Sequence, residues 1–157
     1  IPHNLKIRLK DFSADYSEGF KDKEEVKKKV EKNLHTMMTL QDVLYAHDKY
    51  SILIILQAMD AGGKDGTIRH VMSGVNPQGC QVFNFKKPSD EELDHDYMWR
   101  IHKSLPERGR IGIFNRSYYE EVLVARVQLE ILKKQKLPDE LITKNVWKNR
   151  FSQINDF

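Results

Sequence analysis

The aliphatic run from Ser51 to Ala58, SILIILQA, constrains the fold more than any other feature of the sequence, because it leads directly into the glycine-rich segment AMDAGGKDGT. The run is continuously apolar rather than alternating. This pattern is typical of a strand that is buried on both faces, in the middle of a parallel sheet. A glycine-rich turn after such a strand predicts a strand, loop and helix unit. The sequence therefore indicates an α/β domain.

Two further short runs resemble the first and predict two more strands, CQVFNF at 80–85 and RIGIFN at 110–115. Helical segments are expected between the strands, at 64–73 and 89–104. Alternation of strand and helix requires crossover connections, and these produce a parallel sheet with helices on its faces. We therefore predict three parallel strands.

The remaining segments are expected to be irregular or helical. Residues 1–20 are interpreted as an irregular arm, and a helix is predicted from Lys21 onward. After Asn115 the chain is predicted to be helical again, with a break near Pro138. The N-terminal helix should carry one apolar face, because its apolar residues recur three or four positions apart: Val26, Val30, Leu34, Met37, Leu40 and Leu44.

Composition limits the class of protein. A chain of 157 residues, 39% hydrophobic and 31% charged, is globular in type and long enough for one core. Its net charge of +3 is too small for a protein that coats nucleic acid, so no nucleic-acid partner is expected. The longest apolar run, Ile52–Leu56, is too short to span a membrane. The single cysteine, Cys80, rules out internal disulfides, and we expect a reducing compartment, the cytoplasm.

The segment Ala58–Thr67 has the parts of a phosphate-binding loop. Such a loop needs small residues whose backbone N–H groups approach phosphate oxygens, a helix N-terminus directed at the anion, and a lysine that spans the phosphates. Gly62, Gly63, Lys64 and Gly66 supply these parts. The usual pattern is broken twice, by Ala58 at its first glycine and by Asp65 at its hydroxyl position. An ordinary glycine-rich turn is the alternative.

Asp60 favours the phosphate-loop interpretation. A carboxylate within such a loop would repel the bound phosphate unless a divalent cation lay between them. We therefore predict a Mg²⁺ ion at Asp60, or a base at this position that acts on an incoming phosphate. Asp65 is predicted either to assist with the metal or to cap the following helix.

Two more groups of polar residues follow strand ends. Asn115 and Arg116 follow the third run, where a neutral oxygen ligand and a cation could serve a transferring phosphoryl group. Lys86 and Lys87 follow the second run. Because ligands of open α/β sheets bind at the carboxyl edge of the strands, these lysines are expected to converge with the phosphate loop. The alternatives are a surface or ion-paired arginine and a solvent-facing lysine pair.

The sequences QAMDAGGKDGTIRHV and NFKKPSDEELDHDYMWRIHKSLPERGRIGIFNRSYYEEV closely resemble the polyphosphate kinase 2 family, and the similarity runs from about Ser51 to the end. The resemblance implies a three-layer α/β fold of the P-loop NTPase type, with helices on both faces of a parallel sheet and a helical lid. It also implies Mg²⁺ dependence and phosphoryl transfer between inorganic polyphosphate and nucleotides.

Residue by residue, the resemblance implies that Asp60, Lys64 and Arg116 are catalytic and that Asp60 meets the metal. The Tyr-Glu sequence after FNRS resembles the subgroup that acts on both AMP and ADP. Substrate binding is assigned to the residues that surround these three in the two loops and at the second strand: Gly62, Gly63, Asp65, Gly66, Thr67, Arg69, Lys86, Lys87, Asn115 and Glu120.

The domain prediction is a single kinase domain over 1–157, with an arm and helix at 1–50, a core at 51–117 and lid helices at 118–157. The absence of an initial methionine and the greater length of family members suggest a partial chain. A homo-oligomer is expected, with AMP, ADP and ATP as nucleotide ligands. Two alternatives stay open, an ATP-dependent nucleotide or nucleoside kinase and a non-catalytic nucleotide-binding fragment.

Overall fold

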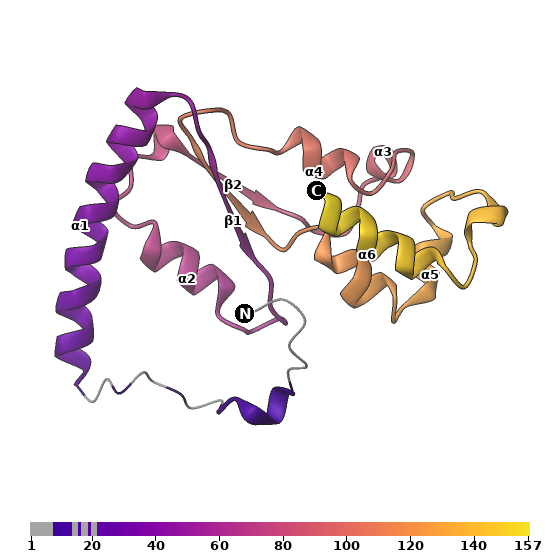
Figure 1. The fold of residues 1–157 in the computed structure, drawn as a ribbon, viewed down its shortest axis with the longest axis horizontal. Coiled ribbons are helices and arrows are strands. Elements are labelled where there is room, and N and C mark those ends of the chain that lie inside the picture. The colour runs from indigo at the N-terminus through magenta and orange to yellow at the C-terminus, as the bar shows by residue number, and fades with distance from the viewer. Residues whose placement is uncertain (1–7, 14–15, 17–18, 20–21) are drawn as a thin grey trace.

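The fold is described from a computed structural model, which covers residues 8–13, 16, 19 and 22–157. Most of the predicted arm at 1–20 lies outside the described residues. Figure 1 shows a central sheet with α1 and α2 on one side and α4, α5 and α6 on the other, so the molecule has three layers. The predicted α/β architecture, with helices on both faces of a parallel sheet, is confirmed.

The sheet contains β1 (Ile52–Leu56), β2 (Cys80–Asn84) and β3 (Ile111–Asn115), all parallel as predicted and arranged in the order β1-β3-β2. The expectation that the first run occupies the middle of the sheet is wrong for the described strands, because β3 is central. Four residues of β3 are buried, whereas β1 is exposed or half-buried throughout. The register places Leu56, Asn115 and Asn84 in one row at the carboxyl edge.

The helical elements connect and cover these strands. Glycine and proline positions separate many of them, as expected from residues that disfavour helix continuation. Their bounds are η1 (Leu9–Asp11), α1 (Lys23–His47), α2 (Lys64–Val71), η2 (Pro77–Gly79), α3 (Asp90–Leu93), α4 (Trp99–Lys103), the π-helical turn η3 (Glu121–Ala125), α5 (Leu129–Lys133), η4 (Asp139–Leu141) and α6 (Val146–Asp156).

The predicted helix at 89–104 is divided into α3 and α4. Its start is as expected, because Ser89 and Glu92 form a reciprocal capping box. The helix stops before Asp96, whose side chain accepts a hydrogen bond from the backbone N–H of Met98 at 2.9 Å. A short polar side chain that competes for backbone donors in this way favours a turn over a continuous helix.

The long helix α1 differs from the amphipathic helix that its sequence indicates. Asp22 caps its first turn as an N-cap residue should. The apolar stripe is not buried, since Val30 is 44% and Leu40 61% exposed. The buried residue of α1 is Gln41, whose amide exchanges two hydrogen bonds of 2.8 Å with the backbone of Asn76. A polar contact therefore fixes α1 against the loop before β2.

The main core lies on the face of the sheet covered by α4 and α6. Phe114 of β3 is fully buried and packs edge-to-face against Phe83 and Phe85. Such aromatic pairs add to the free energy gained from burial. The cluster unites strand ends and helices and consists of Phe85, Met98, Ile101, Phe114, Tyr118, Val122 and Ile154. Within the described residues, no helix is long and apolar enough to cross a membrane.

Candidate phosphoryl-transfer site

The first loop, Ala58–Gly63, turns sharply between β1 and α2. Gly63 is the N-cap of α2 with φ of 80°, a conformation that favours glycine. At Gly62 a side chain would not fit, because an added Cβ would lie 2.9 Å from both Ala58 Cβ and the Met59 carbonyl oxygen. Glycine is thus required for different reasons at the two positions, at Gly63 by the backbone conformation and at Gly62 by the close approach of neighbouring atoms.

Lys64 begins α2 and folds back over this loop. Its Nζ donates hydrogen bonds of 3.1 Å to the carbonyl oxygens of Ala58 and Met59. In this position the ammonium group offsets the partial negative charge of two backbone carbonyls. Anionic oxygens are stronger acceptors than neutral carbonyls, so a phosphate in the loop would compete for the same cation.

The second loop, Asn115–Tyr118, leaves the buried central strand. Arg116 adopts φ of 65°, which is uncommon for a residue other than glycine, and its backbone N–H bonds to the Leu56 carbonyl at 2.9 Å. Ser117 is 1% exposed and Tyr118 8% exposed. Burial, together with neighbouring Tyr119, raises the pKa of the Tyr118 hydroxyl to about 12. Core packing therefore holds the second loop in a sparsely populated backbone conformation.

Two side-chain contacts join the second loop to the first loop and to α2. Arg116 donates to the carboxylate of Asp60, and Asn115 Nδ2 donates to Asp65 Oδ1 at 2.6 Å. The other amide atom of Asn115, Oδ1, is buried and is the one such side-chain atom without a hydrogen-bond partner among the described residues. A buried acceptor without a partner is rare and suggests a site for a further ligand.

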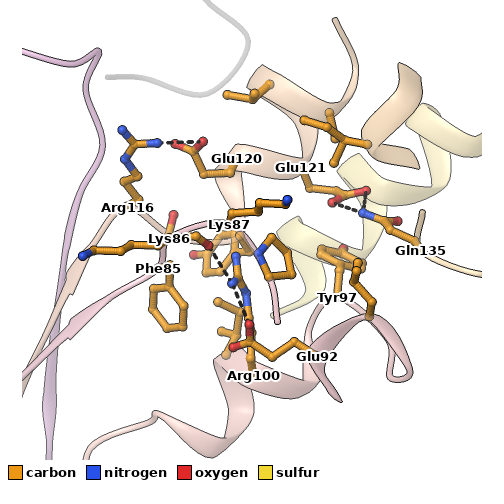
Figure 2. A pocket seen from close by; sticks show the side chains of 18 of the residues that line it. Phe85, Lys86, Lys87, Glu92, Tyr97, Arg100, Arg116, Glu120, Glu121 and Gln135 are labelled. Atoms are coloured by element: carbon orange, nitrogen blue, oxygen red, sulfur yellow. Dashed lines mark hydrogen bonds and ion pairs between the residues drawn. The ribbon is translucent and has the colours of Figure 1, made fainter. Parts of the chain in front are cut away.

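These residues line a common pocket of about 560 Å³ at the carboxyl edge of the sheet. Figure 2 shows Lys86 and Lys87 extending in opposite directions, with Arg116 on the side of Lys86. The pocket brings together most of the charged residues singled out in the sequence. Its lining consists of Asp60, Lys64, Asp65, Asn84, Phe85, Lys86, Lys87, Asn115 and Arg116.

Other predicted substrate-binding residues lie elsewhere. Gly63, Gly66 and Thr67 line a different hollow, between α2 and α1. The Thr67 hydroxyl bonds to the Gly63 carbonyl at 3.0 Å, one turn earlier in its own helix. Arg69 is exposed on α2 and is not part of the pocket lining. Their assignment to substrate stays a prediction.

Glu120 connects Arg116 of the second loop to Gln57, the residue that precedes the first loop. Its Oε2 lies 3.5 Å from an Arg116 nitrogen, and its Oε1 accepts a 2.5 Å hydrogen bond from Gln57. The side-chain oxygen of Gln57, Oε1, in turn accepts from the Ser117 hydroxyl at 3.3 Å. Neither Gln57 nor Ser117 was predicted. The polar Gln57 at the end of an aliphatic run was the available signal for one of them.

The residue after Glu120 belongs to a buried ion pair. Glu121 and Arg150 have side chains 7% and 5% exposed, with Arg150 Nε 3.5 Å from Glu121 Oε1. Gln135 donates to both Glu121 oxygens, at 3.0 and 2.8 Å. Burial raises the pKa of the Glu121 carboxyl above its ordinary value, against the opposing effect of Arg150. Glu121 and Gln135 line a second pocket of about 110 Å³, seen in Figure 2.

The pocket lining includes oxygen ligands of the kind that Mg²⁺ prefers. Asp60 and Asp65 offer carboxylate oxygens there, and Asn115 offers an amide oxygen, Oδ1, that has no partner. Among the described residues no cluster of three or more histidine, cysteine or acidic residues could hold a metal by itself. Mg²⁺ is usually held by one or two carboxylates together with substrate phosphates, so a complete protein cage is not required.

The comparison with known families decides the classification. Residues 20–157 match the family described as Polyphosphate kinase 2 (PPK2). The chain belongs to this family. The resemblance seen in the two loops is thereby confirmed, and polyphosphate kinase 2 structures share the P-loop NTPase-like fold.

Individual relatives agree with the family match. The chain is 47% identical over 152 residues to the ADP-polyphosphate phosphotransferase of Rhodopseudomonas palustris, covering 96% of this chain and 53% of the relative. It is 48% identical to the AMP/ADP-polyphosphate phosphotransferase of Meiothermus ruber, over 75% of this chain and 40% of the relative.

A solved structure of polyphosphate kinase 2 from Arthrobacter aurescens TC1 superimposes with a TM-score of 0.81 at 34% identity, covering 97% of this chain and 52% of that one. The chain thus spans about half the length of the polyphosphate kinase 2 proteins that it matches.

Proposed function

We propose that the chain carries the phosphoryl-transfer site of a polyphosphate-dependent nucleotide kinase, which moves phosphate between inorganic polyphosphate and AMP or ADP. The observation that carries the proposal is the single pocket lined by the first loop, the second loop and the Lys86–Lys87 pair. A polymer with about one negative charge per phosphate needs several cations along its path. The names of the two relatives, an ADP- and an AMP/ADP-polyphosphate phosphotransferase, support the same substrates.

In the transfer towards nucleotide, an oxygen of the acceptor's terminal phosphate attacks the terminal phosphorus of polyphosphate. The bridging P–O bond breaks, and the shortened polyphosphate leaves with the bridging oxygen. Charge accumulates on the oxygens of the transferring group, so catalysis depends on cations already aimed at it. Lys64 and Arg116 supply these cations, after Lys64 exchanges the Ala58 and Met59 carbonyls for phosphate oxygens.

Asp60, with Asp65 and Asn115, would hold Mg²⁺ in this pocket. When bound, the ion would neutralise charge on the phosphates. In the structure Arg116 donates a hydrogen bond to the Asp60 carboxylate. We propose an exchange of partners when substrate binds, in which Arg116 leaves the Asp60 carboxylate and turns to the phosphoryl group.

Glu120 is proposed to face the nucleotide, because it lies next to Arg116 at the border of two pockets. We further propose that the protein works in the cytoplasm as a homo-oligomer. The single cysteine, Cys80, is compatible with a reducing compartment.

A donor assay tests the proposed function. AMP and ADP are offered as acceptors with either long-chain polyphosphate or ATP as donor, and the nucleotide products are separated by chromatography. We expect phosphate transfer from polyphosphate to both acceptors, dependent on Mg²⁺. Faster transfer from ATP than from polyphosphate to AMP would instead favour an ATP-dependent nucleotide kinase.

A further inference from the structure

Gln57 is the first residue after β1, and both ends of its amide are held by residues that follow β3, Ser117 of the second loop and Glu120 just after it. Its Nε2 donates to Glu120 Oε1 at 2.5 Å, and its Oε1 accepts from the Ser117 hydroxyl at 3.3 Å. The side chain is half-buried, so these bonds are shielded in part from water. Both partners are at least 60 residues away in sequence. The amide is thus a tertiary link between the end of β1 and the segment that follows β3, and not a local cap.

The network that begins at Gln57 returns to the first loop. Glu120 uses one carboxylate oxygen for Gln57 and the other for Arg116, and Arg116 reaches Asp60 with its second terminal nitrogen. Asp60 lies only three positions after Gln57. The exposed fraction rises along this path, from 21% at Glu120 to 34% at Arg116 and 87% at Asp60. The less exposed side chain, Glu120, therefore has less room to change its conformation than Asp60.

The chemistry of the amide suits this place. A carboxylate with two oxygens can orient an arginine only if its own rotation is fixed. The N–H of Gln57 fixes one oxygen without adding a charge, so the full negative charge of Glu120 remains available to Arg116. A carboxylate at position 57 would instead face Glu120 with a like charge, which costs free energy in a half-buried site.

We propose that Gln57 is a positioning residue that acts through Glu120, keeping Arg116 directed at the pocket where phosphate is transferred. The inference rests on the proposed function. It gives Gln57 no contact with substrate. Its role is to limit where the Arg116 guanidinium can move once phosphate competes for Arg116 and the metal competes for Asp60.

An exchange experiment tests this role. The variants are Gln57→Glu, Glu120→Gln and the double variant with both changes, each measured in the active protein with the donor that the wild type uses. Gln57→Glu should lower kcat by about tenfold or more, because a hydrogen bond to a charged group is replaced by repulsion. The KM for the donor should change much less, since the loop and lysines that bind phosphate are intact.

The double variant should recover part of the kcat lost in Gln57→Glu, because the two like charges no longer face each other, although position 120 has lost the charge that pairs with Arg116. Such recovery is non-additive, as expected for residues in direct contact. Gln81→Glu is the matched control, since Gln81 is also half-buried on the sheet but lies near the start of β2. It should leave kcat unchanged. Circular dichroism and melting temperature establish that each variant is folded.

Two results would overturn the inference: wild-type kcat in folded Gln57→Glu, or a double variant no better than Gln57→Glu alone. Both are independent of which donor is used. Failure of the proposed function is seen separately, in wild-type protein that prefers ATP to polyphosphate.

Discussion

The helices on the two faces of the sheet are packed to different extents. On one face, Ile101 of α4 is fully buried and Ile154 of α6 is 7% exposed, and both belong to the main core. On the other, α2 has no buried residue, and the buried residue of α1 is the polar Gln41. The second loop extends from the central strand that supports the packed face. The first loop leads into the weakly packed helix α2.

This difference indicates how the site is held. The second loop has its position set by buried neighbours such as Phe114 and Tyr118. The first loop is held mainly by polar contacts. Lys64 donates to the carbonyls of Ala58 and Met59, and Asp60 accepts from Arg116. Regions with few buried apolar contacts open at lower free energy than the core. We therefore expect the first loop to adapt to ligands while the second remains fixed.

The largest expected effect comes from a matched pair of isoleucines on the two faces. Ile101→Ala should lower the free energy of unfolding by about 2–5 kcal/mol, because it removes fully buried carbon atoms from the core. Ile68→Ala, which shortens a half-buried side chain of α2, should cost about 1 kcal/mol or less. Urea denaturation of both variants measures the difference. Equal losses would contradict the asymmetry between the faces.

Lys64→Ala tests the first loop for chemistry. The variant should lose about 100-fold or more in kcat, because a preorganised cation on a transferring phosphoryl group contributes several kcal/mol. Its free energy of unfolding should change by less than about 1 kcal/mol, since the loop lies outside the core. Lys133→Ala, which removes an exposed lysine paired with Glu130, is the control and should keep full turnover. Near-normal kcat in Lys64→Ala would remove the phosphate-loop assignment.

Asp60→Asn keeps the shape of the side chain and removes its charge. Turnover at limiting Mg²⁺ should fall by about tenfold or more, since a neutral amide attracts the cation less strongly. Circular dichroism should be unchanged, because Asp60 is 87% exposed. The measurement is kcat against Mg²⁺ concentration. If the variant matches the wild type at every concentration, Asp60 serves only as a partner for Arg116.

A smaller effect is expected at the edge of the pocket. Lys86→Ala should raise the KM for long-chain polyphosphate by about two- to fivefold, a range typical of exposed charge contacts. Lys87→Ala should have less effect, because Lys87 extends away from the side of Arg116 in Figure 2. Short oligophosphate and ATP should respond less than the polymer.

Added salt should raise the KM for long-chain polyphosphate more than the KM for short oligophosphate or ATP. Exposed charges are screened within about 8 Å at physiological ionic strength. A KM that does not depend on chain length, in wild type and in both variants, would contradict polyphosphate binding by Lys86 and Lys87.

The smallest effect concerns Glu121 on the packed face. Burial raises its folded-state pKa above the ordinary value of about 4.3, so the folded chain holds this proton where the unfolded chain has lost it. The resulting stability is present below the ordinary pKa and is lost as pH rises through the folded-state pKa. Relative to wild type, Glu121→Gln should therefore gain in melting temperature as pH rises from 4 towards neutral.

Glu130 provides a control of opposite sign. Its hydrogen bond and ion pair with Lys133 lower the pKa of an exposed carboxyl, so its contribution is lost as pH falls. Glu130→Gln should lose slightly in melting temperature relative to wild type as pH rises. A Glu121→Gln difference that follows the Glu130→Gln trend would contradict the burial argument.

Local sequence determined the elements that carry the chemistry. The three strands, the capping box at Ser89 and the glycine turn before Lys64 follow from residues that are neighbours in the chain. Strand propensity, capping and backbone freedom are short-range properties, which is why a sequence pattern reveals them. The family resemblance rests on the same short motifs.

Tertiary structure alone decided which of these elements meet. The central position of β3, the anchoring of α1 through Gln41 and the pairing of Glu121 with Arg150 join residues that are distant in sequence. The link from Gln57 to Glu120 spans 63 positions. A lone glutamine or arginine has the same local pattern whether it is solvated or buried, and only packing settles its partner. The two loops could thus be predicted from the sequence, whereas the contacts between their side chains depend on the tertiary structure.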